Sequence, residues 1–194
     1  MRLIIVVLTT SERNIMSTEV THYNRTSQCV HWLSAIVVIG MFAAGVWMVD
    51  LSYYSQWYQT APHWHKSVGI LLLALTLFRI VWKVVTLSPK VEGASWEKVS
   101  AKLAHGFIYL DLMILFVSGY LISTEDGRGI DVFNWFTVPG AGALFEGQSD
   151  LAGLVHEYAA WTLIAIAVLH AAAALKHHFI NQDNTLRKMI GASK

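Results

Sequence analysis

Long apolar runs separated by short polar segments dominate the pattern of this chain. The four longest runs are Val30–Met48, Val68–Val85, Leu103–Ile122 and Leu154–Leu175. Each approaches or reaches the ~17–25 residues that an α-helix needs to span a bilayer. The pattern therefore predicts an all-α protein, an integral membrane four-helix bundle.

The composition agrees with a membrane location. Hydrophobic residues make up 55% of the 194 residues and charged residues only 14%, whereas soluble domains carry about 25% charged residues. A net charge of +1 without any basic run gives no sign of a nucleic-acid partner. We expect one membrane domain over residues 23–194, surrounded by lipid and without an attached soluble domain.

The first 22 residues are expected to form an N-terminal extension outside the working domain. The apolar segment Leu3–Leu8 is too short for the core of a signal peptide, and no small-x-small cleavage site follows it. Met16 also stands at a suitable place for a start. Residues 1–15 are therefore interpreted as an upstream extension without a role, or alternatively as a short anchor at the membrane interface.

Lysine and arginine alternate between the two sides of the predicted bundle. They are frequent in the N-terminal segment, the second loop and the C-terminal tail, whereas the first loop has none before Lys66 and the third has only Arg128. Because positive residues stay inside, both termini are predicted to be cytoplasmic. The third loop, Ser123–Gly153, is long for a bundle and is predicted to hold a partly amphipathic segment on the outer face.

Four histidines fall into two groups at matching depths. His156 and His170 are fourteen residues apart, so they lie on one helix face, ~21 Å apart along the axis. His31 opens the first run at the inner side, and His65 opens the second run at the outer side. We predict an inner pair, His31 with His170, and an outer pair, His65 with His156, each closing both axial positions of a haem iron.

The cysteine content restricts how haem is held. The chain has one cysteine, Cys29, and no C-x-x-C-H motif for covalent attachment. Two non-covalent b-type haems are therefore predicted, which pass electrons and do not readily bind oxygen. The second ring nitrogen of each ligand is expected to bond to a backbone carbonyl one turn earlier.

Other residues in the runs are candidates for cofactor-binding roles. Arg79, fourteen residues after His65, is predicted at the inner level, where it pairs with a haem propionate or else snorkels to the surface. Gly45 and Gly119 leave room for a flat macrocycle. His105 is a candidate to bond a quinone carbonyl or an inner propionate, or else is a plain interfacial histidine.

Two further residues leave alternatives open. Asp111 is a carboxylate inside the third run, and such a group is a functional candidate by default. It is predicted to relay protons or contact quinone, or else to pair with a tyrosine or a backbone group. His63, two residues before His65, is a competing ligand.

Several motifs of the chain resemble those of a known family. They are HWLSAI after Val30, HKSVGIL at His65, SGYLIS after Val117, and LHAAAALKHHF followed by DNTLRKM. These stretches are similar to the bacterial cytochrome b561 family, the small four-helix di-haem b cytochromes of the inner membrane. The resemblance extends from Tyr23 to the end, and it implies electron exchange with ubiquinone and the haem ligands His31, His65, His156 and His170.

The resemblance implies more than one role. Some family members resemble superoxide oxidases, which pass an electron from superoxide outside to quinone, and others are the electron-exit membrane subunits of larger dehydrogenases or hydrogenases. The third loop carries five acidic residues against Arg128, a field that repels an anion and suits a basic soluble redox partner or a neutral donor. A function of another class, a histidine-based metal transporter, is the alternative.

Overall fold

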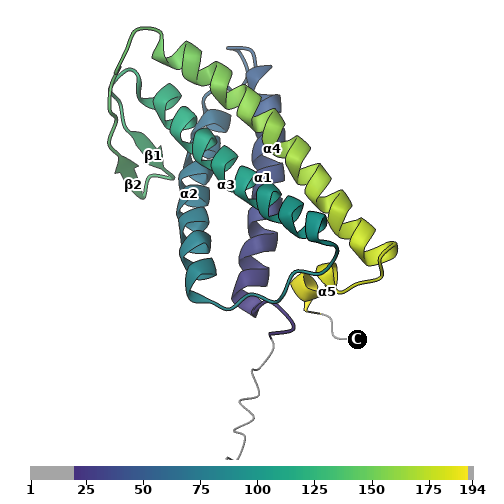
Figure 1. Ribbon diagram of the computed structural model, residues 1–194. Coiled ribbons are helices and arrows are strands. Elements are labelled where there is room, and N and C mark those ends of the chain that lie inside the picture. The colour runs from purple at the N-terminus through teal and green to yellow at the C-terminus, as the bar shows by residue number, and fades with distance from the viewer. Residues whose placement is uncertain (1–19, 192–194) are drawn as a thin grey trace, which may run out of the picture.

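The computed structural model describes residues 20–191, so residues 1–19 of the predicted N-terminal extension lie outside the described residues. Four long helices form the body of the molecule (Figure 1): α1 (Arg25–Val49), α2 (Thr60–Val85), α3 (Ser95–Thr124) and α4 (Gln148–Phe179). Each is long and apolar enough to cross a membrane. The predicted all-α bundle of four spanning helices is confirmed, while the cytoplasmic location of the termini stays a prediction.

The helices extend beyond the apolar runs because polar residues at their ends satisfy free backbone groups. Asn24 caps α1 by accepting a hydrogen bond from the Ser27 amide at 2.8 Å, as an N-cap side chain should. Glu97 accepts a hydrogen bond from the Ala94 amide at 2.8 Å at the start of α3. The starts of α1 and α3 are therefore fixed by polar groups outside the apolar stretches.

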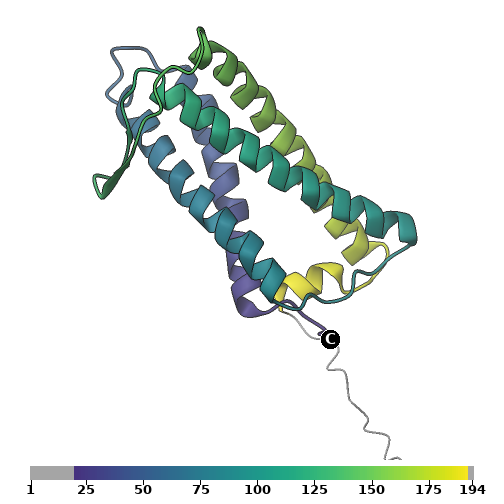
Figure 2. The ribbon, with the colours of Figure 1, turned by 60° about the vertical axis from the view of Figure 1, so that its left-hand side comes forward.

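The bundle is built from two helical hairpins. Helix α1 packs along α2 and α3 packs along α4, whereas contacts between the two hairpins are sparse. Figure 2 shows the two hairpins, with the chain turning at one end between α1 and α2 and between α3 and α4. We name the end at which α1 begins and α4 finishes the terminal end, and the opposite end the loop end.

The long third loop forms a small β-hairpin at the loop end (Figure 1), which was not predicted. Strand β1 (Ile130–Val132) pairs with antiparallel β2 (Phe136–Val138) through a turn at Phe133 and Asn134, whose φ angles are 46° and 60°. The fully buried Ser67 hydroxyl of α2 donates to the Asp131 carbonyl at 3.2 Å and accepts from the Phe133 amide at 3.1 Å. The β-hairpin therefore packs on α2, and its first strand alternates the buried Ile130 and Val132 with the exposed Asp131.

A short helix, α5 (Thr185–Ile190), lies across the terminal end. The Trp32 indole donates to the Met189 carbonyl at 3.2 Å, which ties α5 to α1. The Lys188 ammonium lies 2.5 Å from Glu92 in the loop between α2 and α3, and this bond lowers the pKa of Glu92. The DNTLRKM motif therefore joins both hairpins at this end.

Candidate functional site

Two histidines from different hairpins face each other near the terminal end. His31 of α1 and His170 of α4 have ring centroids 6.4 Å apart and ring planes at 70°. Both side chains are half-buried. The structure therefore brings the predicted inner pair together, and we call it the terminal-end pair.

A second pair with nearly the same geometry lies near the loop end. His65 of α2 and His156 of α4 have ring centroids 6.4 Å apart and ring planes at 66°. Helix α4 supplies one histidine to each pair, and the fourteen-residue spacing separates the pairs by ~21 Å along the helix. The structure therefore brings the predicted outer pair together as well, and we call it the loop-end pair.

The separation within each pair fits two imidazoles on opposite sides of one metal ion. An imidazole nitrogen binds a first-row metal such as zinc at about 2.0–2.1 Å, so two such bonds in line plus half of each ring span about 6 Å. The observed 6.4 Å agrees with this value at both levels. In addition, His65 Nδ1 is buried and has no hydrogen-bond partner within residues 20–191. The four rings therefore fit two metal centres with paired axial imidazoles.

A serine fixes the orientation of one ring in the loop-end pair. Ser118 of α3 donates to the Ile114 carbonyl at 2.7 Å, so its oxygen is free to accept a hydrogen bond from His156 Nδ1 at 3.0 Å. With the proton on Nδ1, the lone pair of His156 is on Nε2, the atom a metal would bind. The partners of His156 belong to the neighbouring helix, where both the Ser118 hydroxyl and the Leu115 backbone bond to the ring.

The two glycines that sequence analysis singled out lie beside the loop-end pair. A Cβ atom at Gly119 would stand 3.1 Å from His156 Cε1, and one at Gly45 would stand 3.5 Å from His65 Cε1. The first distance is tighter than ordinary packing, so only glycine leaves the His156 ring undisturbed at this point. The glycines give room to the histidine rings themselves.

The terminal-end pair has a cationic and aromatic surrounding. Arg79 Nη2 lies 2.8 Å from His31 Nδ1, and because a guanidinium can only donate, the ring nitrogen accepts. The guanidinium of Arg79 also lies 5.6 Å from the centroid of the Tyr109 ring, as does Lys83 Nζ. Arg79 is therefore at the level predicted for it, and in this structure its partner is His31.

His105 of α3 is the third histidine at the terminal end. Its ring centroid lies 5.0 Å from that of His170, which is shorter than the separation of two rings with a metal ion between them. His105 therefore packs against the terminal-end pair as a neighbour. His63 is separate from both pairs in this structure, with its ring centroid 6.3 Å from that of Phe133.

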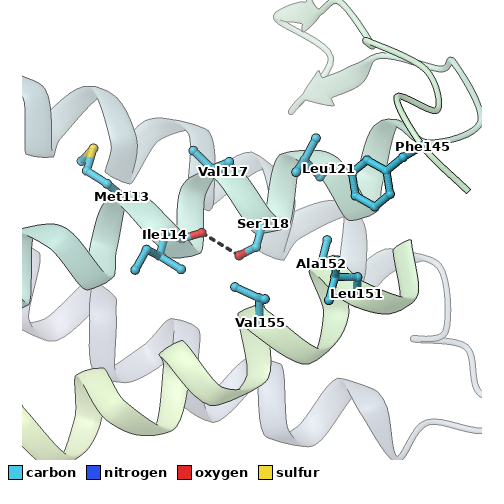
Figure 3. A pocket seen from close by; sticks show the side chains of 9 residues that line it. All are labelled: Met113, Ile114, Val117, Ser118, Leu121, Phe145, Leu151, Ala152 and Val155. Carbon is cyan, nitrogen blue, oxygen red and sulfur yellow. Dashed lines mark hydrogen bonds between the residues drawn. The ribbon is translucent and has the colours of Figure 1, made fainter. Parts of the chain in front are cut away.

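An apolar groove of about 360 Å³ lies between α3 and α4 near the loop-end pair (Figure 3). Val117, Leu121 and Val155 are among its lining residues, and Ser118 turns its hydroxyl back to the Ile114 carbonyl. The apolar lining suits lipid acyl chains. In the part of the chain that the structure describes, no three His, Cys, Asp or Glu side chains are grouped to hold a metal ion.

Comparisons with known proteins show which family and which relatives this chain is similar to. The family described as prokaryotic cytochrome b561 matches residues 22–192. Cytochrome b561 homolog 2 of Escherichia coli (strain K12) is 46% identical over 173 residues, which cover 88% of this chain and 92% of the relative. Cytochrome b561 homolog 1 of the same organism is 24% identical over 89% of this chain and 98% of its own length. A Yersinia pestis protein named "Probable superoxide oxidase CybB" is 27% identical over 83% of this chain and 91% of its own length.

Proposed function

Because the chain belongs to the prokaryotic cytochrome b561 family of membrane electron-transfer proteins that carry haem b, we propose that it is a di-haem cytochrome that exchanges electrons with ubiquinone. One observation carries the proposal: two pairs of imidazoles, each with centroids 6.4 Å apart, lie at two depths of one bundle. His31 and His170 would hold one haem, and His65 and His156 the other. When bound there, each haem would supply a one-electron ferric/ferrous couple.

The paired imidazoles limit the chemistry of the site. Because two protein imidazoles would hold each haem, the site would be suited to electron transfer and not to oxygen binding. The protein contributes the positions of the two centres, the tautomers of the ligands and the surrounding charge.

Arg79 and His105 are the proposed cofactor-binding residues beside the terminal-end pair. For a neutral His31 to offer Nε2 to a metal, its proton must be on Nδ1, so Arg79 cannot also donate to that atom. We therefore expect Arg79 to turn from His31 to a haem propionate, an anion that suits its guanidinium. His105, 5.0 Å from His170, is placed to bond the other propionate or a quinone carbonyl.

The orientation in the membrane follows from the charges of the loops. We propose a location in the bacterial inner membrane with the terminal end cytoplasmic and the loop end periplasmic, because lysine and arginine are concentrated at the terminal end. The two haem sites then lie near opposite surfaces. Electrons would cross most of the hydrocarbon core, which is about 30 Å thick, through these two sites.

The loop end indicates the kind of electron donor. Arg128 is exposed and forms an ion pair with Asp126 at 2.5 Å, and this neighbour holds the pKa of Asp126 below its usual range. Four more acidic residues, Glu125, Asp131, Glu146 and Asp150, lie in this loop or at the start of α4, so the surface attracts cations. We propose a neutral donor or a basic soluble periplasmic protein, and superoxide, which the name of the Yersinia pestis relative suggests, is the alternative.

The test of the proposed function is a dithionite-reduced minus oxidised spectrum of the purified protein with haem counted per chain. Two b-type haems are expected, and reduced protein in vesicles should be reoxidised by ubiquinone. A single haem would show that one pair is misassigned, and no haem from haem-replete cells would refute the proposal. If superoxide reduces the protein at a rate far above the rate with a basic redox protein, superoxide replaces the proposed donor.

Substituting Ser118 by alanine should weaken haem binding at the loop-end pair. The substitution removes the acceptor for His156 Nδ1–H, and loss of such a bond costs roughly 10–100-fold in affinity. Transfer of haem to an apoprotein acceptor measures the effect. The control is Ser100→Ala, because Ser100 also donates to the carbonyl four residues earlier, at 2.8 Å, but is exposed. Equal haem loss from both variants would contradict the role of Ser118.

A further inference from the structure

The mechanism above leaves one buried ionisable group of α3 without a role. Asp111 is only 8% exposed, and its Oδ2 atom is buried without a hydrogen-bond partner among the residues that the structure describes. The tyrosine or backbone partner expected as one alternative is therefore absent at this oxygen. A lone carboxylate inside a membrane span is costly, and a cost of this kind points to a function.

The position of Asp111 along α3 puts it between the two haem levels. It follows His105 by six residues and precedes Gly119 by eight, which are ~9 Å and ~12 Å along the helix. His105 packs against the terminal-end pair, and Gly119 against the ring of His156. Ser118, seven residues later, shares its helix face. Asp111 is therefore buried at a depth between the two proposed haem levels.

The charged and titratable groups on the neighbouring helices are engaged elsewhere. Arg79 and Lys83 of α2 lie over the Tyr109 ring. His170 of α4 lies against His105, and His156 bonds to Ser118. His31 of α1 is bonded to Arg79. Among the described residues, no cation is paired with the Asp111 carboxylate, so its charge can be balanced only when it binds a proton.

We propose that Asp111 is a redox-linked proton acceptor that takes up a proton when an electron enters the haem sites and releases it when the electron leaves. The inference rests on the proposed di-haem function. Asp111 gains one proton from water on a carboxylate oxygen while a one-electron donor reduces one iron from ferric to ferrous. The reverse loss of the proton accompanies oxidation by quinone. An electron added at haem levels that lie ~9 Å and ~12 Å from Asp111 along α3 favours the neutral acid in a low-dielectric span, so the two events are coupled.

The test is a spectroelectrochemical titration of the purified protein at several pH values, after haem counting. In the wild type, the midpoint potential of at least one haem should fall as pH rises, by up to about 59 mV per pH unit for one proton per electron. Asp111→Asn should reduce this slope, and Asp111→Glu should restore it. Asp50→Asn, which alters an exposed carboxylate at the end of α1, is the matched control and should keep the wild-type slope.

Infrared difference spectra of the same samples give a readout that does not depend on the asparagine variant folding. Reduction of the wild type should produce a carbonyl band of a protonated carboxylic acid, and this band should move in Asp111→Glu. A slope that is the same in wild type and Asp111→Asn, or a wild type with neither slope nor band, would overturn the proposal. Failure of the di-haem function is distinguished from either result, because it is seen beforehand as a haem count below two.

Discussion

Replacing His170 by alanine is expected to leave one haem per chain where the wild type has two. His170 is half of the terminal-end pair, with its ring 6.4 Å from that of His31, and one imidazole alone leaves an axial position open. The haem at the loop-end pair should remain, because its two ligands lie about 21 Å away along α4 or on α2. Haem per chain and the reduced spectrum of the purified variant measure the loss.

The interpretation of this variant depends on two comparisons. His178→Ala changes a histidine of the same helix, eight residues further on, and should keep both haems. His105 lies close enough to His170 to replace it, so His105→Ala and the double variant should be measured in parallel. If His170→Ala and the double variant both keep two haems, the assignment of the terminal-end pair is wrong.

Replacing His65 by alanine should remove the other haem and interrupt electron transfer across the membrane. His65 is the α2 ligand of the loop-end pair, and its ring faces that of His156 at 6.4 Å. Without this centre, an electron from the loop end has no carrier in the half of the bundle next to it. In vesicles, a membrane-impermeant donor on that side should reduce the remaining haem at a rate close to that measured without the donor.

The matched control is His63→Ala, because His63 lies two residues before His65 on the same helix. His63 lies near Phe133 of the β-hairpin turn and not in the loop-end pair. It should therefore keep both haems and the wild-type rate. Loss of haem from His63→Ala with retention in His65→Ala would exchange the roles of the two residues, as the competing interpretation of the sequence requires.

The spanning helices and the depth of the histidines could be predicted from sequence because both depend on spacing along single helices. Apolar runs identified all four spans, and a separation of fourteen residues fixed which side chains share a level. The helix ends were less accessible, because the capping groups Asn24 and Glu97 lie outside the apolar runs. The ligand roles of the four histidines stay a prediction that haem counting tests.

The contacts between helices could not be predicted in the same way. Ser118 was inside a quoted motif, but its bond to His156 depends on how α3 packs against α4. A serine one residue before the glycine at the haem level was the signal that could have found it. The partner of Arg79 and the isolation of Asp111 depend equally on the neighbouring helices. The β-hairpin was missed because its turn is formed at Phe133 and Asn134 with positive φ angles, a conformation that is uncommon for phenylalanine.

The separation of the bundle into two hairpins has a consequence for how this protein is made. Each proposed haem site takes one histidine from the α1–α2 hairpin and one from the α3–α4 hairpin, while direct contacts between the hairpins are sparse. With the proposed ligands, haem insertion would also be the step that joins the two hairpins. In a newly inserted chain without haem, the two hairpins would be held together only by these sparse contacts, and the faces between them would be open to lipid and to membrane proteases. The amount of mature protein in a cell should consequently follow its haem supply as well as the rate of its synthesis.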